Sequence, residues 1–197
     1  MGQQRQEYSY TVLSKSDDMT TKIIRSNSFV DVEEYALRGN KHRFFRAVSH
    51  KKGVTIIPLI KDKIILERQY RYNLGKYFSE LPGGGRENDE DVSFTAQREF
   101  TEETGFKSTK PKNLFFIYTA PEFSTSRVNY LICKATGKTP QSLDPTEIIT
   151  TQKISTQKAL AMIKAGKINN NISIIGILYY MCFLSPKDKK KLALFKR

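Results

Sequence analysis

The stretch "GRENDEDVSFTAQREFTEETGF", residues 85–106, places three glutamates within five positions, although the chain as a whole has a net charge of +13. These glutamates are Glu99, Glu102 and Glu103. Like charges one turn apart on a helix repel each other, so a positive group is needed beside them. The stretch therefore predicts a cation site.

We expect a helix from about residue 90 to 104, because apolar side chains recur among the charges and Gly105 follows as a natural C-cap. On this helix Glu99 and Glu103 fall one turn apart on one face, and Glu102 lies beside them, so the three carboxylates should converge. Such oxygen ligands suit hard cations, and Mg²⁺ is commonly held by a few carboxylates together with substrate phosphates. The expected cofactor is Mg²⁺, with Mn²⁺ as the alternative.

The glycine run at the end of "ELPGGG", residues 80–85, directly precedes this helix. Glycine carbonyls can ligate a metal ion, and the absence of side chains lets a phosphate group come close to the backbone. The loop and the helix together therefore predict a cradle for a metal ion and a diphosphate.

These residues resemble the complete Nudix box, with no departure at any defined position. The matching residues are Gly84, Glu90, Arg98, Glu99, Phe100, Glu102, Glu103, Gly105 and Phe106. The resemblance implies an α/β fold, the Nudix α/β/α sandwich with a mixed sheet, together with a small N-terminal antiparallel sheet. It implies that Glu99, Glu103 and the carbonyl of Gly83 are metal ligands, and that Glu102 is a further ligand or a catalytic, water-orienting acid. The residues with a structural role in the box would be Gly84, Glu90, Arg98 and Gly105.

The segments around the box are similar to the ADP-ribose pyrophosphatase branch of this family. The similar parts are "RQYRYNLGKYFSELPGG" at 68–84, Pro121, and "AGKINNNISIIGILYY" at 165–180. This resemblance implies Mg²⁺-dependent hydrolysis of the diphosphate linkage of ADP-ribose or a related nucleotide sugar, which gives AMP and a sugar phosphate. It also implies a homodimer whose subunits share the N-terminal sheet.

Four arginines are candidate substrate-binding residues. Arg71, in "RQYR", would hold a phosphate, because a guanidinium offers a bidentate fork to phosphate oxygens. Arg43 and Arg46 would reach the partner's site in a homodimer. Arg127 follows the loop that is expected to fold over the diphosphate.

That loop, "PEFSTSRVNY" at 121–130, departs from the pattern of the branch. Ser126 stands where the branch usually carries a glutamate that acts as general base or metal ligand. The nearest acid is Glu122, which makes it the first candidate for the catalytic base, with Glu102 as the second. The aromatic residues Tyr70, Tyr72, Tyr77 and Phe78 could stack on a purine, but aromatic residues at strand spacing are more often core.

The chain is expected to contain three parts. Residues 1–50 would form the N-terminal sheet used for dimerisation, residues 51–186 the Nudix hydrolase domain, and residues 187–197 a basic C-terminal tail. Strand patterns occur at 8–13, 28–37, 43–50, 53–60, 63–72, 113–120 and 127–135, and helical patterns at 156–167 and 170–184.

Composition limits the possible location and partners. Cys133 and Cys182 lie far apart, with no CxxC pair and no secretory leader, which favours a reducing cytoplasm. The longest apolar run, at 174–184, is too short to span a bilayer, so no membrane association is expected. The lysines are scattered along the chain, which argues against nucleic acid as a partner and is compatible with a small anionic substrate.

Other functions stay open at this stage. One is a nucleotide-binding Nudix domain with weak hydrolysis, which Ser126 suggests. The others are Nudix enzymes that act on another nucleotide sugar, on a dinucleotide or on RNA 5′ ends.

Overall fold

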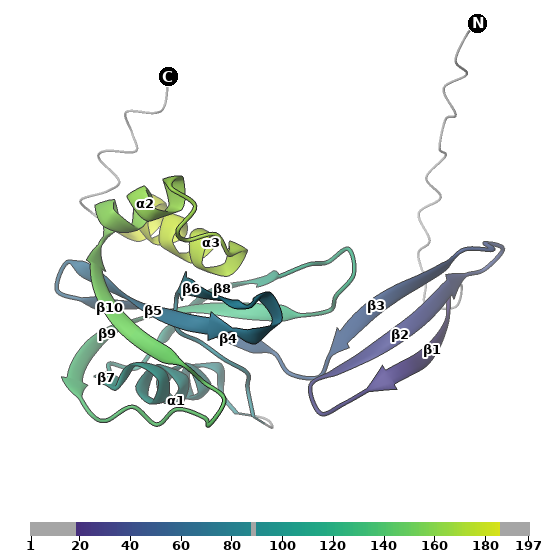
Figure 1. Ribbon diagram of the computed structural model, residues 1–197, viewed down its shortest axis with the longest axis horizontal. Coiled ribbons are helices and arrows are strands. Elements are labelled where there is room, and N and C mark those ends of the chain that lie inside the picture. The colour runs from purple at the N-terminus through teal and green to yellow at the C-terminus, as the bar shows by residue number, and fades with distance from the viewer. Residues whose placement is uncertain (1–18, 88–89, 186–197) are drawn as a thin grey trace, which may run out of the picture.

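The computed structural model describes residues 19–87 and 90–185. The strand pattern at 8–13 and the basic tail at 187–197 lie outside the described residues. Figure 1 shows a larger body built on one sheet and a small sheet that extends away from it.

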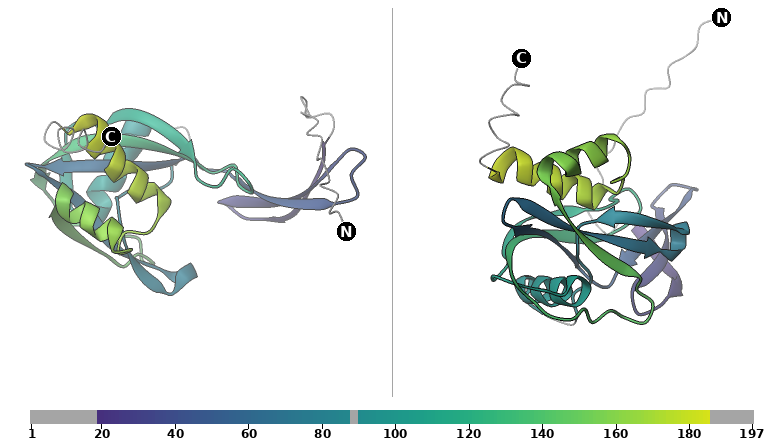
Figure 2. Two further views of the ribbon diagram at one scale, coloured as in Figure 1. Left: turned by 90° about the horizontal axis from the view of Figure 1, so that it is seen from above. Right: turned by 60° about the vertical axis from the view of Figure 1, so that its left-hand side comes forward.

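The small sheet consists of three antiparallel strands in sequence order. These are β1 (Met19–Ser26), β2 (Val30–Leu37) and β3 (Arg43–Ser49). Figure 2 shows that the small sheet projects from one end of the larger body. Several large apolar side chains on this sheet and its β1–β2 turn, including Ile23, Phe29 and Phe45, are exposed.

The large sheet has seven strands and is mixed. They are β4 (Gly53–Ile60), β5 (Lys63–Arg71), β6 (Lys76–Glu80), β7 (Phe106–Ser108), β8 (Lys112–Tyr118), β9 (Arg127–Lys138) and β10 (Ile149–Ser155). The central order is β10-β5-β4-β9-β7, with β6 paired to β5 and β8 paired to β9. The β4–β9 pair is parallel, and the other pairs are antiparallel.

Helices cover both faces of this sheet, as Figures 1 and 2 show. Helix α1 (Val92–Thr104) lies on one face, and α2 (Thr156–Lys164) and α3 (Asn171–Tyr179) lie on the other. Because both faces are covered, the apolar runs of β4 and β5 are buried almost continuously rather than alternately. Each face has its own core, one around Phe100 of α1 and one around Ile177 of α3. The arrangement is the expected α/β/α sandwich.

Most of the expected elements are present, with small differences at their ends. The helix of the box starts after Asp91, and the last helix ends at Tyr179 and continues as a π-helical turn, Tyr180–Leu184. Strands β1, β6, β7 and β10 were not expected. β10 is mostly polar and exposed, because it forms an edge of the sheet and buries only Ile149 and Ile154 well.

No helix within residues 19–87 and 90–185 is long and apolar enough to cross a membrane. Cys133 is buried and Cys182 is exposed, and both are free thiols.

Candidate active site

The helix that carries the three box glutamates is defined by its two ends. The side chain of Asp91 accepts hydrogen bonds from the N–H groups of Ser93 and Phe94, which caps the first turn. The helix ends at Gly105, whose φ of 65° lies in the left-handed region that glycine adopts without strain. The predicted C-cap is confirmed.

The glycine loop packs directly against this helix. The N–H of Gly83 donates a 2.8 Å hydrogen bond to Oε2 of Glu103. A Cβ atom on Gly84 would lie about 2.4 Å from the carboxylate of Glu99, closer than any real contact. The loop therefore meets two box glutamates at positions where a side chain cannot fit.

Arg98 ties the loop to the helix, as the box spacing predicts. Its Nη2 lies 3.2 Å from Oε2 of Glu90 and 3.3 Å from the carbonyl oxygen of Gly85. The hydrogen bonds from Arg98 lower the pKa of Glu90. The same guanidinium contacts Glu102 at 3.0 Å and Glu99 at 3.2 Å.

The three box carboxylates do not converge as the helical wheel suggests. Within residues 19–87 and 90–185, no three His, Cys, Asp or Glu side chains are gathered closely enough to hold a metal ion as they stand. The reason is that Arg98 draws Glu99 and Glu102 to itself, while Glu103 points to Gly83.

A fourth glutamate, Glu67 of β5, lies beneath the site. It is 1% exposed, and its side chain shares a hydrogen bond with Glu103, which is 3% exposed. Oε1 of Glu67 has no hydrogen-bond partner among the described residues. Burial raises the pKa of both carboxyl groups. The charge of Glu67 raises the pKa of Glu103 further, whereas the hydrogen bond with Glu103 acts to lower the pKa of Glu67. Burial also raises the pKa of Glu99 to about 7.

Sequence reasoning missed Glu67. The available signal was a glutamate directly after the apolar run "IIL" in a strand that is covered on both faces. Charged residues are almost never fully buried without a partner, so a buried acid in such a strand points to a functional site.

Glu99, Glu102 and Glu103 line a pocket of about 610 Å³, and Glu67 is not among its lining residues. The glycine loop and the box supply one part of its lining: Gly83, Gly84, Gly85, Glu87, Arg98, Glu99, Glu102 and Glu103. The small sheet supplies Ser49, and its β1–β2 turn supplies Phe29. Other parts of the chain supply the rest: Lys51, Gly53, Gln69, Arg71, Ser126, Ser142, Leu143, Asp144 and Glu147. The pocket therefore combines an acidic floor with a few cationic side chains at its walls.

Glu147 is a second pocket acid that sequence reasoning missed. It lies in the loop 139–148, which follows β9 and is bonded to the end of α1 through the N–H of Ser142 and the carbonyl oxygen of Glu102, 2.9 Å apart. The half-buried Glu147 carboxylate accepts a 3.0 Å hydrogen bond from the N–H of Asp144. Its charge is one of the smaller contributions that raise the pKa of Glu99, after burial. The available signal was the acidic stretch "LDPTE" just before a strand, whereas the sequence pointed to Glu122 and Glu102 as the candidate bases.

The loop after Pro121 is attached to the small sheet rather than folded over the box. The N–H of Ala47 donates to the carbonyl oxygen of Phe123 at 2.8 Å, and the N–H of Thr125 donates back to Ala47 at 3.0 Å. The N–H of Ser49 also donates to Oγ1 of Thr125 at 2.9 Å. Ser126 reaches the pocket, but the exposed Glu122 does not line it.

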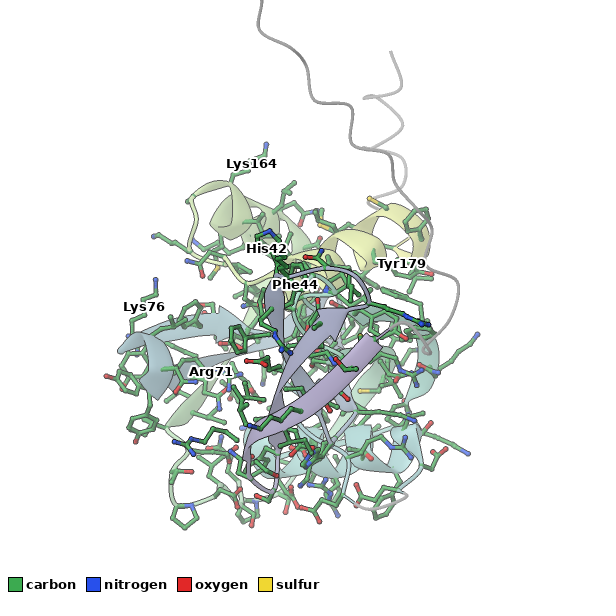
Figure 3. The ribbon with its side chains drawn as sticks, turned by 90° about the vertical axis from the view of Figure 1, so that its right-hand side faces the viewer. His42, Phe44, Arg71, Lys76, Lys164 and Tyr179 are labelled. Atoms are coloured by element: carbon green, nitrogen blue, oxygen red, sulfur yellow. The ribbon has the colours of Figure 1, made fainter. Side chains whose placement is uncertain are left out.

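Arg71 lies at the pocket, as expected, and it already has a partner. Its guanidinium donates two hydrogen bonds to the carboxylate of Glu80, at 3.1 and 2.8 Å. Figure 3 shows Arg71 at the β5–β6 hairpin, on the same side as Lys76. A phosphate bound by Arg71 would have to use the remaining N–H groups or displace Glu80.

The other three candidate arginines are not brought to this pocket within the chain. Arg43 pairs with Glu34 at 3.5 Å, and Arg46 pairs with Glu33 at 2.8 Å. Both pairs lie on the small sheet, where Figure 3 shows the nearby Phe44. Arg127 stacks on the ring of Phe116, with its Cζ 4.4 Å from the ring centroid.

The donors at the pocket fit a divalent metal ion. Three buried or nearly buried glutamates in or next to the pocket, Glu67, Glu99 and Glu103, have pKa values raised by burial, so the donors around them compensate their charged forms only in part. The unpartnered Oε1 of Glu67 is a further buried oxygen without a donor. A hard cation with carboxylate and carbonyl ligands would compensate these charges.

Comparisons with known proteins agree with this geometry. A family model described as NUDIX domain matches residues 49–171. The chain is 30% identical over 145 residues to the methanol dehydrogenase activator of Bacillus methanolicus, across 72% of this chain and 78% of that protein. It is 26% identical over 151 residues to the ADP-ribose pyrophosphatase of Bacillus subtilis (strain 168), across 75% and 82%.

Two further comparisons concern ADP compounds hydrolases. The chain is 29% identical over 99 residues to ADP compounds hydrolase NudE of Escherichia coli (strain K12), across 50% of this chain and 52% of that protein. A crystal structure of an ADP compounds hydrolase superposes with a TM-score of 0.72 at 19% identity, across 90% of this chain and 94% of that one. Because the two sequences are only 19% identical, this superposition is evidence for a shared fold alone.

Proposed function

Because the chain belongs to the Nudix family and is a Nudix hydrolase, we propose that it hydrolyses the diphosphate linkage of ADP-ribose or a related nucleotide sugar. Water would attack one phosphorus atom, the bridging P–O bond would break, and the products would be AMP and a sugar phosphate. The observation that carries this proposal is the contact of the glycine loop with Glu99 and Glu103 on the floor of one pocket. The similarity to a protein named ADP-ribose pyrophosphatase supports the choice of substrate.

Nudix hydrolases generally use divalent metal ions. In this chain Glu99, Glu103 and the carbonyl of Gly83 would hold Mg²⁺, with Glu102 as a further ligand. Bound Mg²⁺ would neutralise the diphosphate and make water a better nucleophile. Glu67 would hold Glu103 in place from below, through the hydrogen bond between the two side chains.

The remaining chemistry falls to side chains on the pocket walls. Arg71 would bind a phosphate of the substrate, in competition with Glu80. Glu147 would accept the proton of the attacking water, because it lines the pocket from the loop 139–148 and its carboxylate is held in place by the hydrogen bond from the Asp144 N–H. Glu102, which is more exposed and paired with Arg98, is the second candidate, and Glu122 is the third because it lies outside the pocket.

The proposal includes a homodimer formed through the small sheet. The exposed Ile23 and Phe45 on this sheet support it, because a three-stranded sheet with little core of its own gains stability by covering such residues. In a dimer, Arg43 and Arg46 would be candidates to reach the partner's pocket.

A substrate panel tests the function directly. The purified protein with Mg²⁺ would be assayed against ADP-ribose, ADP-glucose, GDP-mannose, a deoxynucleoside triphosphate and capped RNA, with released AMP, GMP or phosphate as the readout. ADP-ribose or another ADP-sugar should give the highest kcat/KM, and AMP should appear in equal amount to the sugar phosphate. Release of phosphate from the triphosphate as the dominant activity would contradict the proposal. Inactivity towards the whole panel would contradict it as well.

A further inference from the structure

A second pocket, of about 460 Å³, lies where helix α1 ends, and we call it the lysine pocket. Its lining residues are Thr104, Gly105, Phe106, Lys138, Thr139, Gln141, Thr151 and Lys153. Among these described residues none is acidic, and none of them lines the active-site pocket. A smaller pocket of about 230 Å³ shares Phe106, Lys138 and Lys153 with it. Both pockets therefore open onto the same two ammonium groups.

The two lysines come from different strands and lie over one ring. Nζ of Lys138 is 5.6 Å from the centroid of Phe106, and Nζ of Lys153 is 4.9 Å from it. Phe106 is 6% exposed and stacks on Phe100 of α1, so its ring belongs to the core beneath the pocket. Lys138 is the last residue of β9, and Lys153 lies within β10. Both lysines are exposed, so their ammonium groups are accessible to a ligand.

Neither lysine has an acidic partner. Within residues 19–87 and 90–185, no carboxylate forms an ion pair with Lys138 or Lys153. Carbonyl groups at the end of a helix attract cations, but those at the end of α1 are already used. They accept hydrogen bonds from residues 139–142 and belong to Glu102, Glu103 and Gly105. The two neighbouring cations are therefore left without a negative group to balance their charge.

The remaining polar groups of the pocket are neutral donors. They are the hydroxyl groups of Thr139 and Thr151 and the side-chain amide of Gln141. Ammonium, hydroxyl and amide donors around one opening suit a compact anion with several oxygen atoms, such as a phosphate group. A flat nucleobase would find no exposed aromatic face here, because the ring of Phe106 is buried.

A third lysine adds positive charge on the same face of the sheet. Lys63 of β5 pairs with Ser155 of β10, which is two residues beyond Lys153. Side chains two positions apart on a strand point to the same face, as do directly paired residues on neighbouring strands. Lys63 and Lys153 therefore point to the face that α1 covers, where their combined field attracts an anion.

The lysine pocket lies at the base of the loop 139–148, which also lines the active site. Figure 1 shows this loop passing along α1 between the end of β9 and the start of β10. Its first part contributes Thr139 and Gln141 to the lysine pocket, and its later part contributes Leu143 and Glu147 to the active-site pocket. An anion that contacts lysines of both β9 and β10 would join the two strands that hold the ends of this loop.

From this arrangement we propose that the lysine pocket is a second binding site, for an anion that carries a phosphate group, and that the loop 139–148 transmits its occupation to the active site. The phosphate oxygens would accept hydrogen bonds from the ammonium groups of Lys138 and Lys153 and from a threonine hydroxyl. By linkage, a ligand of the active site would change the affinity for this anion by the same factor as the anion changes the affinity for that ligand. The site does not depend on which diphosphate the protein hydrolyses.

NMR titration of the isotope-labelled full chain in EDTA tests the site. Inorganic phosphate and ribose 5-phosphate are added in separate series, with chloride at equal ionic strength as the reference. The backbone amide signals of Thr139 and Thr151 should shift and saturate with both ligands, because both carry the phosphate group. A saturable shift with only one of them would also support the site and would show that it selects the free ion or the ester. No saturable shift with either would refute it.

Lysine variants show whether the phosphate binds where the structure indicates. Lys138→Gln and Lys153→Gln should each weaken phosphate binding at least about tenfold, since each removes a charged hydrogen-bond donor. Lys164→Gln is the matched control, because Lys164 is an exposed lysine at the end of α2, on the other face of the sheet (Figure 3), and lines neither pocket. Its dissociation constant should equal that of the parent. An equal loss in Lys164→Gln would overturn the site.

The loop signals test the transmission to the active site. In the parent, phosphate should shift the amide signals of Leu143 and Glu147, which do not line the lysine pocket, with the dissociation constant measured at Thr151. In Lys153→Gln these shifts should weaken together with that of Thr151. Saturation at Thr151 with no change at Leu143 and Glu147 would refute the transmission. If all three signals respond equally in the parent and in Lys153→Gln, the phosphate binds elsewhere, as at Arg71, and the inference is overturned.

Discussion

Glu67 and Glu103 are two buried carboxyl groups joined by a hydrogen bond, one from the central strand β5 and one from helix α1. Two carboxylates cannot form such a bond without a proton between them. Burial raises the pKa of each group, so the pair retains this proton at a higher pH than exposed glutamates do. The interior of the site therefore keeps a proton when no metal ion is bound.

The first prediction concerns the stability of the metal-free protein. An acid whose pKa is raised by folding stabilises the fold below its unfolded pKa, and this contribution is lost as the pH rises through the folded pKa. With EDTA, the free energy of unfolding should therefore fall between about pH 5 and 8. Urea denaturation at several pH values measures this. Because Glu99 has its pKa raised to about 7, Glu99→Gln should show a smaller fall. A parent whose stability rises over this range would contradict the prediction.

The second prediction concerns the box glutamates. Glu99→Gln and Glu103→Gln should each lower kcat at least about 100-fold, because each variant keeps the shape but removes a charge that holds the metal ion. Glu90→Gln should have a smaller effect, since Glu90 pairs with Arg98 and does not line the pocket. Circular dichroism would verify that all three variants are folded. Near-normal kcat of either of the first two at saturating Mg²⁺ would show that the metal ligands are assigned incorrectly.

The third prediction separates the candidate bases. Glu147→Gln should lower kcat at least about 100-fold with little change in metal affinity, as expected for loss of a general base. Glu122→Gln should stay within about twofold of the parent, which is less than about half a kcal/mol of barrier. Glu102→Gln should disturb metal affinity as well as kcat. A large loss of kcat in Glu122→Gln together with a near-parental kcat in Glu147→Gln would show instead that the general base is Glu122, in the loop after Pro121.

The fourth prediction uses the glycine loop. In Gly84→Ala the new methyl group would occupy the space of the Glu99 carboxylate, so this side chain must move. Metal affinity should fall at least about tenfold, as for other changes that misplace a ligand. Gly137→Ala is the control, because its new methyl group would meet Lys107 only at 3.9 Å. Unchanged metal binding in Gly84→Ala would mean that Glu99 does not approach the loop in solution.

The fifth prediction concerns assembly. Light scattering at micromolar concentration should give twice the mass of one chain. Phe45→Glu, on the exposed surface of β3, should shift the protein towards the monomer because a charge would be buried at the interface. Phe94→Glu, equally exposed but on α1, should not. A parent that is monomeric and fully active would contradict the homodimer.

The sequence predicts those parts of the site that are set by local spacing. The box helix, its end at Gly105 and the Arg98–Glu90 pair follow from residues at most eight positions apart. Glu67 and Glu147 could not be found in this way, because tertiary packing brings them to the box from β5 and from the loop 139–148. The same holds for Glu122, which lies close to a motif position in the sequence but belongs to a loop that β3 holds away from the pocket. The edge strand β10 was not predicted, because most of its residues are polar and exposed and do not show the alternation of apolar and polar residues that indicates a strand.

The hydrogen bonds between β3 and the loop after Pro121 constrain the length of this loop more than its amino-acid composition. The three bonds that join Ala47 and Ser49 to the loop involve backbone groups of Phe123 and Thr125 and a single hydroxyl. Most side chains in this loop can therefore be substituted without loss of these three hydrogen bonds. The insertion or deletion of one residue, in contrast, would move the backbone groups of the loop out of register with β3. Because Phe29 and Ser49 of the small sheet also form part of the pocket wall, such a change in length would reshape the pocket without touching the box. Natural or engineered changes of substrate range are therefore expected to come from the length of this loop more readily than from its composition.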